Sequence, residues 1–412
     1  MTHDDKTMLA LAALTYRGFG YHSEAVIRRL LASWLPVLAD EGLGRWELAW
    51  GPASFRAPTS LVDDAMAYVA RRLDDAPGAP PRYVLAIRGT NPVSLFDWTF
   101  GDVWVRHQVD WPSTAGARLS ASTALGLAIL RNLTADEPPS LGGNLAPLAN
   151  ALTSSLQSIV RELPELLPEQ ILTHPEALSD AALLERVELL TGTSGERLRL
   201  GLFDRVLEHF EDATEPVRSL VHERVYDLLL ESIARSRGPG TTIEEFLEQT
   251  VEPGAEVTVI GHSKGGALAL AMALCLAEGW AARGRADVRC FTFAGPTAGN
   301  SAFAARYDTV LGARTRCIVN RRDIVPQAWA VTDLAEIGTT YPLLDLPTDA
   351  LSQSVRRLGY THVAGTQVAF TPNGPARALG EELIHQHLDA YLQEAGFTGA
   401  RWNALSIFLD RG

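Results

Sequence analysis

Cysteine is rare in this sequence, and a long apolar run is missing. Only three cysteines occur in 412 residues, Cys275, Cys290 and Cys317, and none of them belongs to a Cys-x-x-Cys pair. So small and odd a number excludes a disulfide framework, and without paired thiols a zinc site made of thiolates has no support. We expect three reduced thiols in the core. No run of eighteen apolar residues is present, which predicts that no segment spans a membrane.

Positive charge is also scarce. Lys and Arg number 36 against 49 Asp and Glu, which gives a formal net charge of −13. Nucleic acids and anionic membranes attract basic surfaces, so we expect no nucleic-acid partner and at most a peripheral contact with a lipid surface. The short apolar run Met8–Leu14 follows His-Asp-Asp-Lys instead of a basic segment, which argues against a secretory signal. The default expectation is a cytoplasmic protein, and export by a route without an N-terminal signal is the alternative.

The chain divides into three blocks. Residues 1–131 and 251–412 alternate between strand and helix patterns, which predicts an α/β fold with a mostly parallel sheet and helices on both faces. Residues 132–250 are rich in Leu and Glu and almost lack β-branched runs, which predicts a large all-helical insertion. We interpret this insertion as a cap. The alternatives are a mobile lid that presents apolar helices to lipid, and a partner-binding surface.

Apolar spacing predicts the individual elements. Helices are expected where apolar residues recur every three or four positions, and strands where short apolar runs end in turn residues. Helices in the first and third blocks are expected at residues 7–16, 61–73, 267–278 and 375–395, and strands at residues 83–87, 257–260, 288–293, 316–320 and 363–370. Helices in the insertion are expected at residues 145–163, 176–190, 195–211, 215–236 and 242–249, the last with Thr241-x-x-Glu244 as its capping box.

One motif is typical of a nucleophile. Gly261-His262-Ser263-Lys264-Gly265-Gly266 lies between a predicted strand and a predicted alanine-rich helix, which is the context that a G-x-S-x-G elbow requires. In such an elbow the serine occupies a sharp, strained turn, and the glycines let strand and helix approach closely. The helix N-terminus supplies free amides and a positive dipole end. Ser263 is therefore the candidate nucleophile, and the alternative is a small-residue turn that packs a helix on a strand.

A serine nucleophile needs a base and a carboxylate that orients it. The base is nearly always an imidazole, and in this kind of fold the order along the chain is serine, acid, histidine. Asp323 follows the predicted strand 316–320 and so lies at its carboxyl end, unlike the other downstream aspartates. We expect Asp323 to orient the base. A surface ion pair with Arg321 or Arg322 is the alternative.

Three histidines follow Asp323 in the chain: His362, His385 and His387. His362 opens a predicted strand and is interpreted as structural. His385 and His387 share a predicted helix, on which side chains two residues apart differ in direction by roughly 200°, so only one can reach Ser263. We favour His387 as the base and keep His385 as the alternative. A His-x-His metal pair lacks a nearby third ligand, so no metal and no cofactor are expected.

The charge that develops on the substrate oxygen needs hydrogen-bond donors. One should be the amide of Lys264, the residue after the nucleophile. The other should come from Arg88-Gly89-Thr90, the loop after an early strand, where Thr90 offers both its amide and its hydroxyl. The alternative role for Thr90 is a turn residue that satisfies its own backbone.

Together these residues resemble the class 3 lipases, the family of the fungal triacylglycerol lipases. The matching stretches occur in the family's order and cover roughly residues 55–125 and 251–395. They are Leu85-Ala86-Ile87-Arg88-Gly89-Thr90 with Asp97-Trp98 and Asp102, Gly261–Gly266, Phe293-Ala294-Gly295-Pro296-x-x-Gly299-Asn300 with Phe303, and Asn320-x-x-Asp323-x-Val325-Pro326.

The resemblance implies an α/β-hydrolase fold and a metal-independent carboxylic ester hydrolase, either a triacylglycerol lipase or a carboxylesterase. Its substrates would be acylglycerols or related lipid esters. The resemblance also implies Ser263 as nucleophile, Asp323 as the orienting acid, and Thr90 with Lys264 as oxyanion donors. A phospholipase, including a toxin delivered to another cell, is the alternative activity. An inert hydrolase scaffold used for binding is the alternative from another class.

The chain departs from the family in three respects. The family usually secretes its members, whereas no secretory signal is expected here. The family has His-x-x-Tyr after its acid, whereas three residues separate His387 from Tyr391. The block 132–250 is much longer than the family's connection at that place, so the lid and the substrate class do not follow from the resemblance.

Overall fold

A computed structural model describes most of the chain outside residues 136–239. The described residues are 1–17, 24–55, 65–76, 78–89, 105–135, 240–281, 287–372, 379–399, 401–403 and 407. The helices predicted between residues 145 and 236 lie outside these ranges. So do four residues of the early motif: Thr90, Asp97, Trp98 and Asp102.

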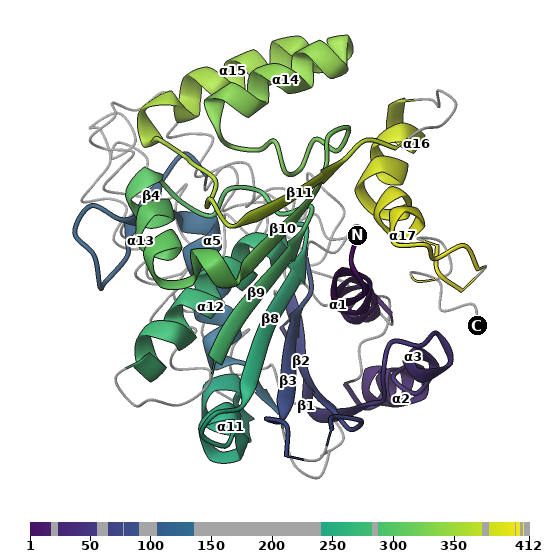
Figure 1. Cartoon of the computed structure of the whole chain (residues 1–412). Helices are drawn as coiled ribbons and strands as arrows, with labels where there is room; N and C mark the ends of the chain where they lie inside the picture. The colour runs from purple at the N-terminus through teal and green to yellow at the C-terminus, as the bar shows by residue number, and fades with distance from the viewer. Residues whose placement is uncertain are drawn as a thin grey trace, which may run out of the picture.

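A seven-stranded sheet runs through the molecule, with the strand order β1-β2-β3-β8-β9-β10-β11 (Figure 1). The strands from β3 onward in this order are parallel, whereas β1 and β2 join antiparallel at one edge. The mostly parallel sheet predicted from the sequence is confirmed, and its parallel strands bring their carboxyl ends to one edge. The strands are β1 (Trp46–Phe55), β2 (Ala65–Arg72), β3 (Arg82–Ile87), β8 (Glu256–His262), β9 (Asp287–Phe293), β10 (Thr315–Asn320) and β11 (Thr366–Phe370).

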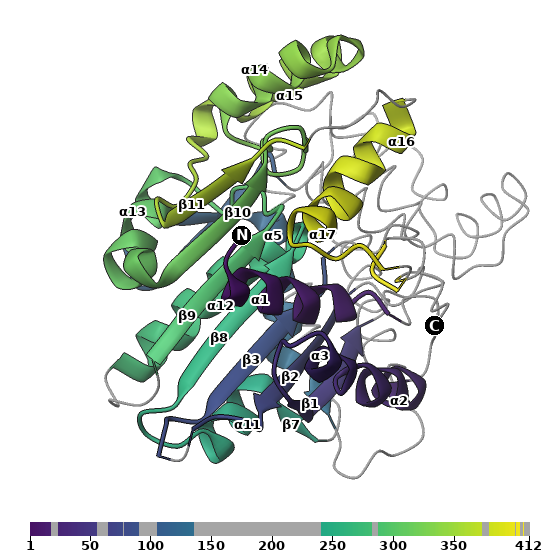
Figure 2. The same cartoon turned by 45° about the vertical axis from the view of Figure 1, so that its right-hand side comes forward.

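Helices cover both faces of this sheet (Figures 1 and 2). One face carries α5 (Ala121–Asn132), α11 (Ile243–Thr250), α12 (Lys264–Ala281) and α13 (Ser301–Leu311). The other face carries α1 (His3–Leu14), α2 (Glu24–Trp34), α3 (Val37–Asp40) and α17 (Ala390–Glu394). After β10 the chain forms α14 (Val331–Thr340) and α15 (Asp345–Val355), at the top of Figure 1. None of the described helices combines the length and the apolarity needed to cross a membrane.

Each face of the sheet buries its own hydrophobic core, because side chains alternate along the central strands. Leu85 and Val259 pack toward α12, whereas Ala86 and Ile260 pack toward α1. Both α1 and α12 are apolar on nearly all sides, as is typical of helices inside a core. The position of α1 matters for function, because it is held against β3 and β8 (Figure 2), the strands that lead to the predicted nucleophile.

The helix predicted at residues 61–73 is wrong where the structure describes it. Ala65–Arg72 forms β2, which pairs with β1 on one side and with β3 on the other. A strand covered on both faces has a continuous apolar run, which fits helical spacing as well as strand spacing. Pairing with two neighbouring strands decides the outcome. The buried residues of this run are Met66, Ala67, Tyr68, Val69 and Ala70.

Other predicted elements have shifted ends. The first helix begins at His3, because Thr2 and Asp5 form a capping box. The last strand begins at Thr366 and is shorter than predicted. The capping box of α11 is Thr242 with Glu245, one residue later than predicted, because residue 242 is still paired in a strand.

The chain enters and leaves residues 136–239 at neighbouring points. β6 (Thr134–Ala135) pairs antiparallel with β7 (Thr241–Thr242), so the two ends of this segment meet beside β1. The division of the chain at residue 250 assigns α11 to the insertion, yet α11 packs in the same core as α12, through Ile243, Phe246 and Leu247. The helical character of residues 136–239 stays a prediction.

Candidate active site

Strand β8 turns into helix α12 through one strained residue. β8 ends at His262 and α12 begins at Lys264, so Ser263 alone makes the turn. Its φ of 62° lies in the left-handed region, which costs a non-glycine residue about 1–3 kcal/mol. Hydrogen bonds hold the turn: Ser263 N–H donates to Phe293 O at 2.9 Å, and Gly266 N–H donates to Ser263 O at 2.7 Å. This is the sharp strand-to-helix turn that the sequence predicts.

Glycines let three chain segments converge at Ser263. A Cβ on Gly261 would lie 1.9 Å from the carbonyl oxygen of Gly265, which is too short for any side chain. A Cβ on Gly89 would lie 2.9 Å from the Cβ of Ser263. The end of β3 therefore lies directly against the candidate nucleophile.

Of the two predicted oxyanion donors, Lys264 lies among the described residues and Thr90 does not. Lys264 is the first residue of α12, so its amide belongs to the helix N-terminus next to Ser263. Gly89 is the last described residue of the early loop. Thr90 lies outside the described residues, and both donor roles stay predictions.

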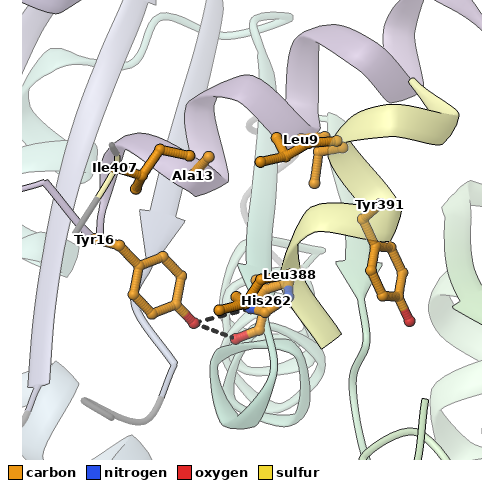
Figure 3. A pocket seen from close by; sticks show the side chains of 8 residues that line it. Leu9, Ala13, Tyr16, His262, Leu388, Tyr391 and Ile407 are labelled. Carbon is orange, nitrogen blue, oxygen red and sulfur yellow. Dashed lines mark hydrogen bonds between the residues drawn. The ribbon is translucent and has the colours of Figure 1, made fainter. Parts of the chain in front are cut away.

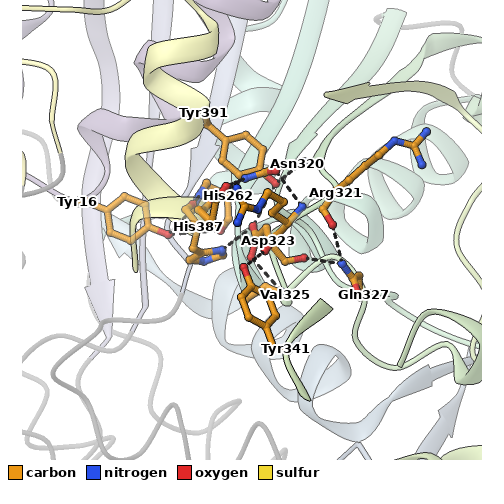
Figure 4. A network of polar contacts seen from close by, with 12 residues as sticks. Tyr16, His262, Asn320, Arg321, Asp323, Val325, Gln327, Tyr341, His387 and Tyr391 are labelled. Carbon is orange, nitrogen blue, oxygen red and sulfur yellow. Dashed lines mark hydrogen bonds and ion pairs between the residues drawn. The ribbon is translucent and has the colours of Figure 1, made fainter. Parts of the chain in front are cut away.

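Asp323 follows β10 and is buried, with 1% of its surface exposed. Its Oδ2 accepts hydrogen bonds from His387 Nδ1 at 2.8 Å and from the Tyr391 hydroxyl at 3.1 Å, and its Oδ1 accepts from Val325 N–H at 3.0 Å (Figure 4). Within the described part of the chain, neither Arg321 nor Arg322 forms an ion pair with it, and Arg322 pairs with Glu382 at 3.0 Å instead. The structure therefore brings Asp323 together with one of the two candidate histidines.

His387 lies in a π-helical turn, His385–Asp389, between α16 (Leu379–Ile384) and α17. Such a turn accommodates one residue more than an α-helical turn. The extra residue between His387 and Tyr391 fits this geometry, since both side chains still reach Asp323 Oδ2. His385 points elsewhere, with its Nδ1 3.8 Å from an oxygen of Asp389. The sequence favours His387 and keeps His385 as the alternative, and the contact with Asp323 also favours His387.

A buried polar network fixes this turn to β10. Tyr391 receives a hydrogen bond from Asn320 N–H at 3.0 Å, and Asn320 Nδ2 donates to the backbone and the side-chain oxygen of Gln386 at 2.8 and 2.7 Å. Burial raises the pKa of Tyr391 well above its usual 10, and the Asp323 carboxylate raises it further. The phenol therefore keeps its proton and donates a hydrogen bond to Asp323. Sequence reasoning named Tyr391 only for its spacing from His387 and gave it no role, and it missed Gln386, which no local motif singles out.

His262, the residue before Ser263, is a further residue that sequence reasoning missed. It is buried, and both ring nitrogens have partners: Nδ1 lies 2.9 Å from the hydroxyl of Tyr16, and Nε2 lies 2.8 Å from the carbonyl oxygen of His387. Burial lowers the pKa of His262 well below its usual 6.5, and the neighbouring His387 lowers it further. His262 is therefore neutral at ordinary pH and ties the base to the elbow.

The neutral state of His262 predicts a pH-dependent stability. Below pH 6.5 the unfolded chain binds a proton at this residue and the folded chain does not, so stability falls as the pH falls toward the depressed folded pKa. The contribution is up to about 1.4 kcal/mol per pH unit. Urea unfolding of the wild type and of His262→Gln between pH 7.5 and 5 measures it. The wild type should lose more stability over this range. Equal slopes would mean that His262 titrates normally in the folded protein.

The remaining candidates have structural contacts. His362 Nε2 lies 3.2 Å from Asp333 Oδ2, which fits the structural role expected of it. This hydrogen bond lowers the pKa of Asp333 below its usual range. The three cysteines carry free thiols, and Cys290 and Cys317 are buried. Among the described residues, no group of three or more His, Cys, Asp or Glu side chains is placed to hold a metal ion.

Known proteins share features with this chain. The family model for class 3 lipases matches residues 190–332, a stretch that includes the elbow and Asp323. Phospholipase A1-II 4 of Oryza sativa subsp. japonica is 29% identical over 170 residues, and the match covers 37% of this chain and only 40% of that protein. The crystal structure of M37 lipase superposes with a TM-score of 0.64 at 24% identity, over 98% of this chain and 95% of that one. The resemblance to class 3 lipases is thus confirmed by the family model, and the α/β-hydrolase fold by the superposed structure.

Proposed function

We propose that this protein is a serine hydrolase of lipid carboxylic esters, with Ser263 as nucleophile, His387 as general base and Asp323 as the orienting acid. One observation carries the proposal. The 2.8 Å hydrogen bond from His387 to Asp323 joins an imidazole to a buried carboxylate, while the carbonyl of His387 accepts from the residue next to Ser263. An imidazole that is oriented by a carboxylate and tied to the residue before a strained serine supports the arrangement that acyl transfer requires.

The reaction would proceed through an acyl-enzyme. The Ser263 hydroxyl oxygen attacks the ester carbonyl while His387 Nε2 takes its proton, and the amide of Lys264 with Thr90 stabilises the oxyanion. Asp323 stabilises the imidazolium. The tetrahedral intermediate then breaks its bond to the alcohol, which leaves with the proton from His387. Water, deprotonated by His387, attacks the acyl carbon and releases the acid and free Ser263.

The substrate class proposed first is acylglycerols, because the family resembled is that of the lipases. A chain-length series of p-nitrophenyl esters from acetate to palmitate tests it, with Ser263→Ala as the control. Activity that peaks at long chains and disappears in the variant would support a lipase. A peak at short chains would instead indicate a carboxylesterase whose helical block acts as a cap.

A phospholipase is the second candidate, since the curated relative bears the name of a phospholipase A1. Mixed micelles of diacylphosphatidylcholine and emulsions of triacylglycerol, assayed for released fatty acid, separate the two activities. Hydrolysis of the phospholipid alone would overturn the acylglycerol proposal and leave the mechanism unchanged.

The choice of base has a direct test with a matched control. His387→Ala should lower turnover by at least about a thousandfold, because no group remains to take the proton of Ser263. His385→Ala removes an imidazole from the same π-helical turn, and we expect turnover within about threefold of the wild type. Initial rates on the best p-nitrophenyl ester, with circular dichroism as the check on folding, decide between them. The reverse result would make His385 the base.

A further inference from the structure

The protonation of His262 follows from its two contacts. A carbonyl oxygen can only accept, so the 2.8 Å contact between His262 Nε2 and His387 O requires that Nε2 carries a proton. The buried ring is neutral, so Nδ1 is bare and can only accept. The hydroxyl of Tyr16, 2.9 Å away, must therefore donate to Nδ1. Tyr16 thus satisfies the bare Nδ1 of the tautomer that can hold the backbone of His387.

The surroundings of this pair strengthen the hydrogen bond between Tyr16 and His262. Tyr16 and His262 line a cavity of about 30 Å³ whose other walls are apolar (Figure 3). In such low-dielectric surroundings a hydrogen bond is stronger, and an unpaired polar group is costlier, than in water. The apolar walls come from α1, from the C-terminal helix and from Ile407: Leu9, Ala13, Leu388, Tyr391, Leu392 and Ile407.

Tyr16 is held in place by the N-terminal helix. At the start of α1, the carboxylate of Asp5 accepts two hydrogen bonds from Arg316 of β10, at 2.7 and 2.8 Å. In the middle of α1, the carbonyl of Leu11 accepts from the hydroxyl of Tyr68 at 2.7 Å. Tyr16 follows the end of α1. A Cβ added to Gly89 would lie 2.5 Å from the Tyr16 hydroxyl, so the phenol packs closely against the end of β3. The helix therefore presents the phenol to His262 with little freedom.

We propose that Tyr16 and His262 are positioning residues for the catalytic base: Tyr16 holds the ring of His262 by donating to its bare Nδ1, and His262 anchors the carbonyl of His387 through Nε2–H. The inference rests on the proposed function, in which His387 accepts the proton of Ser263. The ring centroids of His262 and His387 are 4.7 Å apart, so a cation on His262 would oppose the imidazolium that forms on His387. The neutral Nε2–H tautomer of His262 meets both requirements, because it donates a hydrogen bond to the carbonyl of His387 and carries no charge.

Tyr16→Phe tests the proposal, because it removes the donor and keeps the ring. We expect kcat to fall between about tenfold and a hundredfold with KM nearly unchanged, since the base is displaced while substrate contacts stay intact. Tyr68→Phe is the matched control: it removes another buried tyrosine hydroxyl that bonds to α1, without contacting His262. It should lower thermal stability to a similar degree and leave kcat within about twofold. Equal kcat values for Tyr16→Phe and Tyr68→Phe would overturn the proposal, and so would a rise in KM alone.

Nitrogen-15 spectra of histidine-labelled protein supply a readout that does not depend on turnover. The signals missing from His262→Gln identify His262. They should show protonated Nε2 and bare Nδ1 in the wild type, and a shifted Nδ1 signal in Tyr16→Phe, where Nδ1 loses its donor. An Nδ1–H tautomer in the wild type would contradict the inference. If instead Ser263→Ala keeps full turnover, the proposed function fails, and the spectra still decide whether Tyr16 donates to Nδ1 of His262.

Two replacements of His262 separate hydrogen bonding from packing. The side-chain amide in His262→Gln can still donate to His387 O from a position similar to that of Nε2, and so should restore part of the turnover. It should retain more kcat than His262→Leu, which has no donor. Equal kcat values for the two variants, with folding intact, would assign His262 a packing role only.

Discussion

Replacing Ser263 by alanine is expected to lower ester turnover by several orders of magnitude, up to about a millionfold. The reason is chemical: without the hydroxyl no acyl-enzyme can form, and His387 has no proton to accept. Alanine keeps the Cβ, so the φ of 62° is no more strained than with serine, and the elbow glycines still fit. The variant should therefore fold like the wild type. Initial rates with the best p-nitrophenyl ester, together with thermal unfolding curves, measure both expectations.

A fluorophosphonate probe separates an enzyme from an inert scaffold, the alternative from another class. An activated Ser263 should form a covalent adduct that mass spectrometry assigns to the peptide containing Gly261–Gly266. Ser263→Ala should give none. His387→Ala should label far more slowly, because the hydroxyl loses its base. A wild type that resists the probe and hydrolyses no ester would contradict the proposed function and favour the scaffold.

The parts of the site that the sequence predicts are those with local physical causes. The elbow is readable because a strained turn between strand and helix needs glycines at fixed offsets, and residues 261–266 supply them. Asp323 is readable because the carboxyl end of a parallel strand is where the chemistry of such sheets lies. The parallel sheet itself follows from alternating strands and helices.

The parts that the sequence does not predict depend on distant partners or on local irregularity. Tyr16 meets His262 across a separation of 246 residues, and Tyr391 meets Asp323 across 68. No window of sequence contains either pair. The choice between His385 and His387 depends on a π-helical turn, which changes the direction of side chains without a residue type that announces it. The wrong prediction of a helix at β2 also has a non-local cause. The apolar run fits a helix as well as a strand, and only pairing with β1 and β3 distinguishes them.

Asp323→Asn should have the second large effect, a loss of about ten-thousandfold in kcat, the size seen when such an acid is replaced in a serine triad. Asp323 accepts at both oxygens, from His387 and Tyr391 at Oδ2 and from Val325 N–H at Oδ1. Asparagine has only one acceptor oxygen. If that oxygen faces His387, the amide NH2 opposes Val325 N–H. If the NH2 faces His387, Nδ1 must be bare and Nε2 protonated, so the imidazole cannot take the proton of Ser263.

The second donor to Asp323 Oδ2, the hydroxyl of Tyr391, provides the control for this prediction. Tyr391→Phe removes one donor to Oδ2 but keeps the carboxylate and the proton on His387 Nδ1, so its kcat should fall far less, by no more than about tenfold. Steady-state kinetics from pH 6 to 10, with unfolding curves for both variants, make the comparison. A kcat for Asp323→Asn within tenfold of the wild type would reduce the Asp323–His387 contact to a structural hydrogen bond. Because the asparagine changes charge and tautomer without removing a side chain, lost packing could not account for a larger fall.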